Sequence, residues 1–111
     1  MNAQVFTLTD IVARHNERAG TLFYEFFRVP TLSAGLYRLA AGATDPQQPH
    51  GEDEVYFVLH GHATLQVETD NVVVGPGSIA HIPARVPHRF HTITEALEVL
   101  VVFAPAETAA C

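Results

Sequence analysis

The stretch that decides the fold is residues 42–61, GATDPQQPHGEDEVYFVLHG, a polar, turn-rich segment that leads into an apolar strand. Gln48 and His50 are two residues apart, so on an extended chain their side chains share one face. On a straight strand Glu54 would lie about 13 Å from His50, too far to share an ion. Residues 51–53 predict a tight turn that brings Glu54 back beside His50.

A second segment, residues 77–90 (GSIAHIPARVPHRF), supplies a histidine from a distant part of the chain. Two prolines stiffen the approach to a strand that begins at His88, which shares a face with Phe90. Two imidazoles and one carboxylate suit Fe(II), and also Mn, Ni, Zn or Co, with open positions for substrate or water. We therefore expect one divalent transition metal ion on His50, Glu54 and His88, with Gln48 as a weaker oxygen ligand. A metal-free polar cluster is the alternative.

Both segments resemble the two motifs of the cupin superfamily of small β-barrels, over roughly Leu32 to Phe103. The resemblance implies an all-β fold, a cupin-type antiparallel barrel (jelly roll) with the metal inside, and leaves the reaction open. The residues that match the motifs are Gly42, His50, Glu54, Gly61, Gly77, Pro83 and His88.

Three positions depart from these motifs. Gln48 stands where the family usually has its first histidine, which should weaken metal affinity or change the metal preference. Arg85 replaces a glycine and suggests a different turn, and Thr92 replaces an asparagine.

The rest of the chain reads as one short helix followed by short strands. Asp10 can cap a helix over residues 10–18, with Gly20 as its stop. Alternating apolar residues between turn signals indicate about eight strands, typical of an antiparallel barrel. We expect one domain overall, with a helix and strand extension over residues 1–30 and the barrel over 31–111. The expected strands are 22–28, 33–40, 54–59, 63–68, 72–74, 78–82, 89–94 and 97–103.

Composition excludes several classes of protein. The chain has 111 residues and a net charge of −6, so it lacks the basic face that nucleic acid or an anionic membrane requires. The absence of lysine excludes P-loop, Schiff-base and pyridoxal-phosphate enzymes. A single cysteine, Cys111, excludes a disulfide framework. No signal peptide is visible in Met1–Asp10, and the apolar run Val99–Ala104 is too short for a bilayer, so we expect a cytoplasmic protein.

The remaining histidines have less specific interpretations. His60 and His62 flank Gly61 in an expected hairpin and read as surface residues rather than a ligand pair. His81 could face the barrel interior beside the site, or be a hydrogen-bonded core residue. We expect His91 to face away from His88, and His15 to lie on the helix surface.

Several side chains are expected around the ion. Tyr56 shares its face with Glu54, and Phe90 shares its face with His88, so both should line the substrate pocket, with His81 as a further candidate. Val58 is expected to fill the core. Glu52 and Asp53 are read as solvated turn residues.

The pattern favours a metal-dependent enzyme of oxygenase, isomerase or lyase type that acts on a small polar molecule, with no catalytic residue assigned. The alternatives are a non-catalytic small-ligand binding or sensor module with a partly degenerate metal site, and a plain structural barrel. The apolar strand Val99–Phe103 and the aromatic stretch Leu22–Phe27 predict a homodimer.

Overall fold

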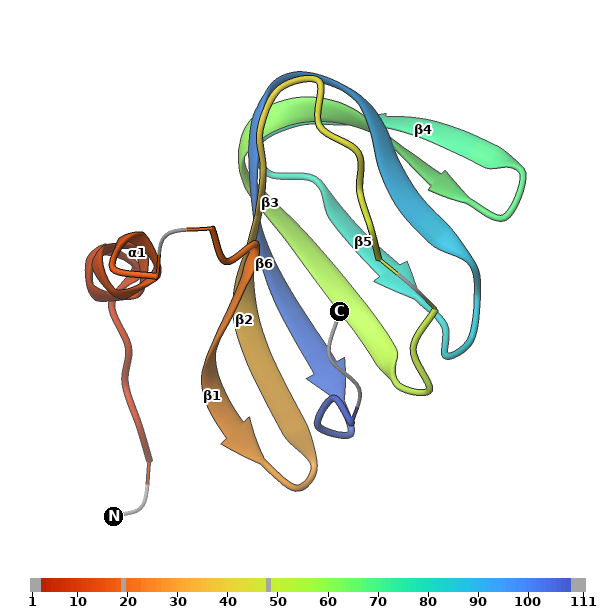
Figure 1. The fold of residues 1–111 in the computed structure, drawn as a ribbon. Helices are drawn as coiled ribbons and strands as arrows, with labels where there is room; N and C mark the ends of the chain where they lie inside the picture. Colours follow the sequence, from red (N-terminus) through yellow and green to blue (C-terminus); the bar gives the residue numbers. More distant parts are fainter. Residues whose placement is uncertain (1–2, 19, 48, 109–111) are drawn as a thin grey trace.

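The computed structural model describes residues 3–18, 20–47 and 49–108. Each strand pairs antiparallel with its neighbours in the order β1-β2-β6-β3-β4, and β5 also pairs with β3 (Figure 1). The expected all-β jelly-roll fold with a short N-terminal helix is confirmed. Over the described ranges the elements are α1 (Leu8–Asn16), β1 (Phe23–Val29), β2 (Leu32–Leu39), β3 (Asp53–Val67), β4 (Asp70–Val74), β5 (Ile79–Ile82) and β6 (His88–Ala104).

Strands β3 and β6 form one long ribbon that folds over on itself. One end of the ribbon pairs Asp53 with Ala104, and the other pairs Val67 with His88. Between them, register shifts over residues 58–64 bend the ribbon, because bulges increase local twist and curvature. The first half of the ribbon joins β2 and β5, and the second half joins β4. The bend therefore turns the two ends of the ribbon toward each other across the barrel.

The bend also explains why the expected number of strands was wrong. Residues 54–59 and 63–68 belong to one strand, β3, and residues 89–94 and 97–103 belong to one strand, β6. Gly61 looked like a hairpin turn, and it does have a positive φ of 93°. It lies inside a bulge where the ladder resumes on both sides, so the chain does not reverse there.

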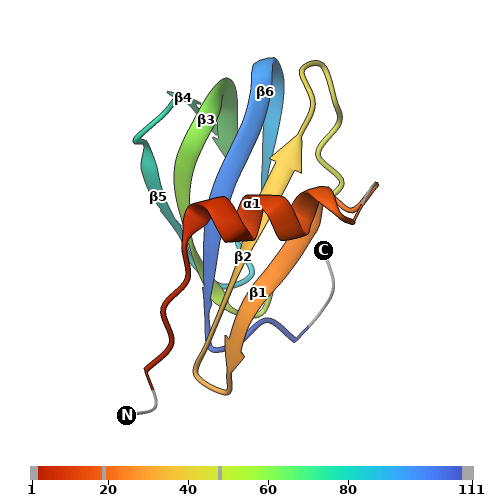
Figure 2. The same cartoon turned by 90° about the vertical axis from the view of Figure 1, so that its left-hand side faces the viewer.

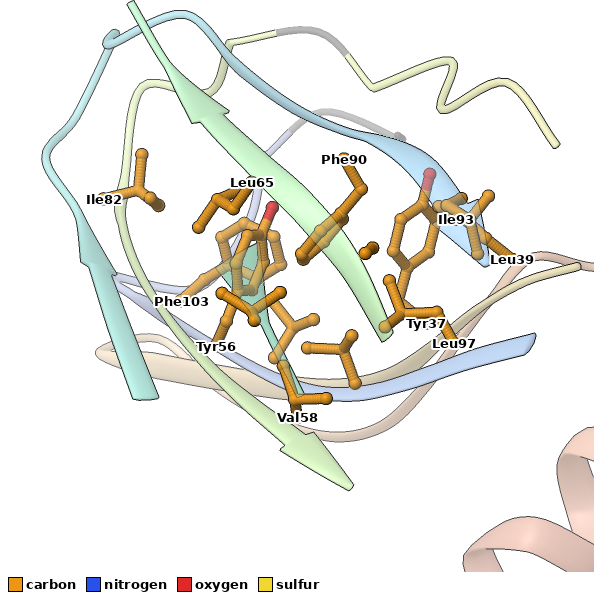
Figure 3. Packing of buried hydrophobic residues seen from close by; sticks show 14 residues of the cluster. Tyr37, Leu39, Tyr56, Val58, Leu65, Ile82, Phe90, Ile93, Leu97 and Phe103 are labelled. Atoms are coloured by element: carbon orange, nitrogen blue, oxygen red, sulfur yellow. The ribbon is translucent and has the colours of Figure 1, made fainter. Parts of the chain in front are cut away.

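The barrel interior is filled by side chains from facing strands. The largest of the fully buried core residues are aromatic: Tyr37, Tyr56, Phe90 and Phe103. Figure 3 shows the hydroxyl oxygens of Tyr37 and Tyr56 pointing to the same side of this cluster. Val58 is part of the core, as expected. The core is therefore apolar at its centre and carries two polar tips on one side.

Helix α1 lies across the outer face of the sheet, over β2 (Figure 2). It begins two residues earlier than the sequence suggested, because Thr7 caps it by accepting a hydrogen bond from Asp10 N at 3.2 Å. His15 is buried at 2% exposure, so its expected position on the helix surface was wrong. Its Nε2 lies 2.7 Å from the Thr21 carbonyl oxygen, which can only accept, so Nε2 carries the proton. Of the described residues, none belongs to a helix long and apolar enough to cross a membrane.

His15 makes the attachment of α1 sensitive to acid. Burial lowers the pKa of His15 against the opposing effect of its hydrogen bond to Thr21. The unfolded chain binds a proton on His15 near pH 6.5, whereas the folded chain binds it only at lower pH. The contribution of neutral His15 to the free energy of unfolding is therefore complete above about pH 6.5, and it is lost as the pH falls through the lower folded pKa. We expect His15→Gln, which keeps an amide donor for Thr21, to lose less stability between pH 7.5 and 5 than the wild type. Denaturant unfolding at each pH measures this, and parallel curves for the two proteins would contradict it.

Candidate functional site

Glu54 and His88 meet because of the folded ribbon. Glu54 is the second residue of β3, and His88 is the first residue of β6. They belong to opposite ends of the ribbon, yet His88 Nε2 lies 2.9 Å from Glu54 Oε1. Both side chains are 1% exposed. The sequence prediction that these two residues converge inside the barrel agrees with this geometry.

The surroundings of His88 decide which nitrogen faces the carboxylate. Its Nδ1 lies 2.8 Å from the Val86 carbonyl oxygen, so Nδ1 carries a proton, and Nε2 is the atom directed at Glu54. Burial opposes a charge on this imidazole, but contact with Glu54 and the Val86 carbonyl outweighs it, and the pKa of His88 is raised. In the metal-free protein His88 and Glu54 therefore form a close buried pair.

Glu54 has more acceptor capacity than its surroundings use. Among the described residues its Oε2 has no hydrogen-bond partner, although the atom is buried. A buried carboxylate oxygen without a donor is costly, and a cation relieves that cost. A hydrogen bond from Nδ1 to a backbone carbonyl is also how proteins orient a histidine that binds a metal through Nε2. Glu54 and His88 therefore offer two side chains of the kinds that bind divalent metal ions.

His50 belongs to a second buried pair. Its ring packs edge-to-face on Phe103 at 5.0 Å, and Phe103 is the direct partner of Glu54 in the β3–β6 ladder. Its Nδ1 lies 3.2 Å from Glu107 Oε2. Within the described part of the chain, no three His, Cys, Asp or Glu side chains are grouped closely enough to hold a metal. Gln48 lies outside the described residues.

A hydrogen-bonded layer of polar side chains lies beside this pair. Asp45, which is buried, accepts hydrogen bonds from Tyr37 Oη at 2.5 Å and from the Phe90 amide at 2.9 Å. Gln47 contacts Asp45 through its backbone amide at 3.1 Å and Tyr56 Oη through its side chain at 2.8 Å. The layer joins the loop before β3 to the two polar tips of the core.

Tyr56 keeps its proton in this environment. Burial, followed by the negative charge of Glu54, raises the pKa of Tyr56 well above its ordinary value. Its ring lies 5.8 Å from the His88 ring and 5.2 Å from Phe90. Tyr56 thus lies between His88 and Phe90, and it can serve as a hydrogen-bond donor but not as a base at neutral pH.

Sequence reasoning missed Asp45, Gln47 and Glu107. Asp45 and Gln47 are two residues apart, the spacing that puts side chains on one face of an extended segment, and this signal could have identified them. Glu107 has no such signal, because it follows the last strand in an alanine-rich stretch. Its burial depends on a contact between segments far apart in the chain.

Two predictions about residues around the site were wrong. His81 does not line the pocket: its side chain is 60% exposed, because β5 alternates and Ile82 is the residue that faces inward. Glu52 is not solvated: it is buried and accepts a hydrogen bond from Thr108 Oγ1 at 2.8 Å. Asp53, in contrast, is exposed and accepts from the Ala84 amide.

The other histidines lie where they were expected. His60 and His62 are exposed and approach Glu98 and Glu95, respectively. His91 bonds to Asn71 at 2.7 Å on the outside of the barrel. None of these three residues reaches the Glu54–His88 pair.

A cleft of mixed character, which Pro49 and Pro87 also line, reaches His88 from outside. It has a volume of about 220 Å³, and its lining includes Gln47, Gln66, Glu68, His88 and Arg89. Both the amide of Gln47 and the ring of His88 belong to the interior cluster as well. A small polar molecule could therefore approach the pair through this cleft.

The two departures from the second motif both have a positive φ. Arg85 has a φ of 66° and Thr92 a φ of 51°, the left-handed region that glycine and asparagine tolerate best. The different turn expected at Arg85 stays a prediction. The Arg85 amide donates to the His50 carbonyl at 2.6 Å, so this turn helps to place His50.

Thr92 is the more strained of the two, because a β-branched side chain at positive φ is disfavoured. Thr92→Asn is expected to increase the free energy of unfolding by about 1 kcal/mol, since asparagine tolerates this conformation. Thr94→Asn is the control, because Thr94 is also an exposed position of β6 but has no positive φ. Denaturant titration measures both, and equal effects at the two positions would rule out backbone strain as the cause.

Comparison with known proteins settles the family. A family model described as "Cupin domain" matches residues 35–103. The chain belongs to the cupin family. The match covers the cupin sheet from β2 to β6 and includes Glu54 and His88, whereas Glu107 lies beyond it.

Individual cupins and cupin-like structures resemble the chain to different extents. It is 44% identical over 105 residues to the uncharacterized protein SCO3923 of Streptomyces coelicolor, covering 95% of this chain and 99% of that protein. The structure of TT1209 from Thermus thermophilus has a TM-score of 0.70 and 28% identity, covering 93% of this chain and 98% of that one. The DMSP lyase DddQ from Ruegeria pomeroyi DSS-3 has a TM-score of 0.70 and 26% identity, covering 79% of this chain. The match covers 49% of the lyase, so this chain corresponds to about half of that enzyme.

Proposed function

We propose that the protein is a metal-dependent enzyme that acts on a small polar molecule bound in its barrel. The observation that carries the proposal is the buried Glu54–His88 pair, with Nδ1 of His88 committed to a carbonyl and one carboxylate oxygen of Glu54 unused among the described residues. The ion, one of Fe, Mn, Ni, Zn or Co, is held by Glu54 and His88, with His50 as third ligand through its Nε2 and Gln48 as a weaker fourth. When bound, it supplies a Lewis acid or, if it is iron, a redox centre.

The residues around the ion have separate roles in this proposal. Glu54 offsets part of the charge of the cation, and His88 is held rigidly by Val86. Tyr56 keeps its proton and donates a hydrogen bond to an oxygen of the substrate, while Gln47 orients that hydroxyl. The volume of the cleft, about 220 Å³, favours a small substrate. The similarity to a lyase supports an enzymatic role and does not name the substrate.

Metal content tests the proposal directly. Protein purified without oxygen or chelators is expected to carry about one equivalent of a transition metal, measured by plasma mass spectrometry. Equilibrium dialysis of the stripped protein against each of the five ions then ranks their affinities. His81→Ala, which removes an exposed histidine, is the matched control and should bind as the wild type does. Less than about a tenth of an equivalent after reloading with every ion would refute the proposal.

A non-catalytic ligand-binding or sensor module is the second candidate. It is favoured by the fact that each site histidine already has a carboxylate neighbour, Glu54 for His88 and Glu107 for His50. In this case the chelator-treated protein should bind small acids, phenols or sugars with unchanged affinity. Turnover of any such compound that depends on added metal would exclude this candidate.

A second copy of the chain is the proposed macromolecular partner. Phe57 pairs with Ile79 on the outer face of the sheet, where both side chains are exposed, and Val55 extends the apolar surface. We expect a homodimer by light scattering at micromolar concentration, and Ile79→Glu should give a monomer. A monomeric wild type would contradict this. The cytoplasmic location stays a prediction.

A further inference from the structure

The cleft that reaches His88 has its rim at one end of the β3–β6 ribbon. There Gln66 is the ladder partner of Arg89, and the ladder ends at the next pair, Val67 with His88. Glu68 follows in the turn between β3 and β4. Arg89 and Glu68 both line the cleft, and both residues are exposed. One positive and one negative side chain therefore lie at the same opening.

The backbone of Glu68 is held in place by its neighbours. The Glu68 amide donates to the Pro87 carbonyl at 2.9 Å, and the side-chain amide of Gln66 donates to the Glu68 carbonyl at 2.9 Å. These bonds keep Glu68 at a φ of 55°, which few side chains other than glycine and asparagine adopt freely. They use only main-chain atoms of Glu68, so its carboxylate remains available to a ligand.

The charges of Arg89 and Glu68 are not used within the described part of the protein. No ion pair or hydrogen bond there involves the Arg89 guanidinium or the Glu68 carboxylate, and the two groups do not pair with each other. Arg28 and Arg38, in contrast, each contact a glutamate. A free guanidinium and a free carboxylate on one cleft are complementary to a ligand that carries both charges.

The inner wall of the cleft offers no comparable free charge. The side-chain amide of Gln47 contacts Tyr56 and Asp45, and the ring of His88 faces Glu54. Two prolines complete the described lining, and their rings are apolar. This lining fits a molecule with charged ends and a short aliphatic middle.

We propose that this cleft binds a small zwitterion, with its carboxylate on the Arg89 guanidinium and its cationic group on the Glu68 carboxylate. Arginine suits the carboxylate, because the planar guanidinium can donate two parallel hydrogen bonds to it. A zwitterion has no net charge, so the net charge of −6 does not repel it as it would a simple carboxylate. The volume of about 220 Å³ suits a ligand of only a few non-hydrogen atoms.

The inference rests on the proposed function in one respect, since it names the class of small polar molecule that enters the barrel. It requires no metal, because neither Arg89 nor Glu68 is a proposed ligand of the ion. Binding can therefore be measured on chelator-treated protein.

Three zwitterions of increasing length serve as probes: glycine, β-alanine and γ-aminobutyrate. Each is compared with the carboxylate that lacks its ammonium group and with the amine that lacks its carboxylate; for β-alanine these are propionate and ethylamine. Chelator-treated protein is titrated with each compound at constant ionic strength, and backbone ¹H–¹⁵N spectra report the dissociation constants. Constant ionic strength is needed because salt screens exposed charges.

Two variants each remove one charge from the cleft, Arg89→Gln and Glu68→Gln. Arg14→Gln and Glu95→Gln are the matched controls, because they change the net charge equally at exposed positions outside the cleft. We expect at least one zwitterion to bind about 5- to 10-fold more tightly than both of its single-charge analogues. Arg89→Gln should remove this preference without weakening the amine, and Glu68→Gln should remove it without weakening the carboxylate.

The control variants should keep the preference of the wild type. The inference would be overturned if no zwitterion were preferred, or if either cleft variant behaved as its control does. Zwitterion binding by a protein that binds no metal would support the inference and refute the metal-dependent enzyme. Metal binding without any preference for a zwitterion would overturn the inference alone.

Discussion

Gly61→Ala is expected to destabilise the protein by about 2–5 kcal/mol, a large part of the stability of a domain of this size. Two costs add up. The residue has a φ of 93°, a conformation that a side chain disfavours by about 1–2 kcal/mol. A methyl group there would also overlap the Ala96 carbonyl oxygen and lie 2.7 Å from Leu97 Cα, both of them backbone atoms of the facing strand. Because the backbone cannot move aside cheaply, the bulge has to open.

Gly77→Ala is the matched control for this effect. Gly77 has a nearly equal φ of 89°, but a methyl group there meets no atom within 4 Å. It should therefore cost only the conformational term of about 1–2 kcal/mol. Thermal and denaturant unfolding compare the two variants, and we expect the melting temperature of Gly61→Ala to fall by roughly 10–20 °C. Equal losses in both variants would show that the close approach to β6 is unimportant.

His88→Leu is expected to have two large effects, one on binding and one on stability. Metal affinity should fall by more than about 100-fold, because the loss of a ligand weakens binding more than the loss of an outer-shell partner does. The metal-free protein should lose about 3–5 kcal/mol, because the Glu54 carboxylate is left buried without its partner. Dialysis against the preferred ion measures the first effect, and urea unfolding in the presence of a chelator measures the second.

The double variant Glu54→Leu/His88→Leu distinguishes the two effects. Replacing a buried ion pair by apolar side chains of similar volume is often close to neutral. We therefore expect the double variant to recover most of the stability lost in His88→Leu, while it still binds no metal. If the double variant is less stable than either single variant, the Glu54–His88 pair stabilises the fold by itself. The interpretation that this pair is present in order to bind an ion then loses its support.

Prediction from the sequence succeeded where the spacing of residues along one strand decides the outcome. Alternation placed Tyr56 with Glu54, and Phe90 with His88, on the inner faces of β3 and β6. The same rule applied to β5 would have put Ile82 inward and His81 outward, but the apolar neighbours of His81 suggested otherwise. His15 was misplaced because the helix pattern shows one apolar face and does not reveal that β1 and β2 cover a histidine on it.

The contact partners of the site residues could not be predicted from the sequence. The spacing of His50 and Glu54 predicted that both residues bind one ion. In the metal-free structure Glu54 instead contacts His88, and His50 contacts Glu107. Each of these contacts joins segments more than 30 residues apart. No local pattern predicts them, because they depend on how far the β3–β6 ribbon bends and where the chain turns after it.

The resemblance of two motifs to a known family implied the cupin fold. By itself, the sequence determined an antiparallel all-β barrel, the identity of the two convergent residues Glu54 and His88, and the net negative charge of the chain. These follow from turn chemistry, strand alternation and composition, which act over a few residues. Only the tertiary structure decided that Asp45, Gln47 and Glu107 surround the site, because burial of a polar side chain is a property of the segments that close over it.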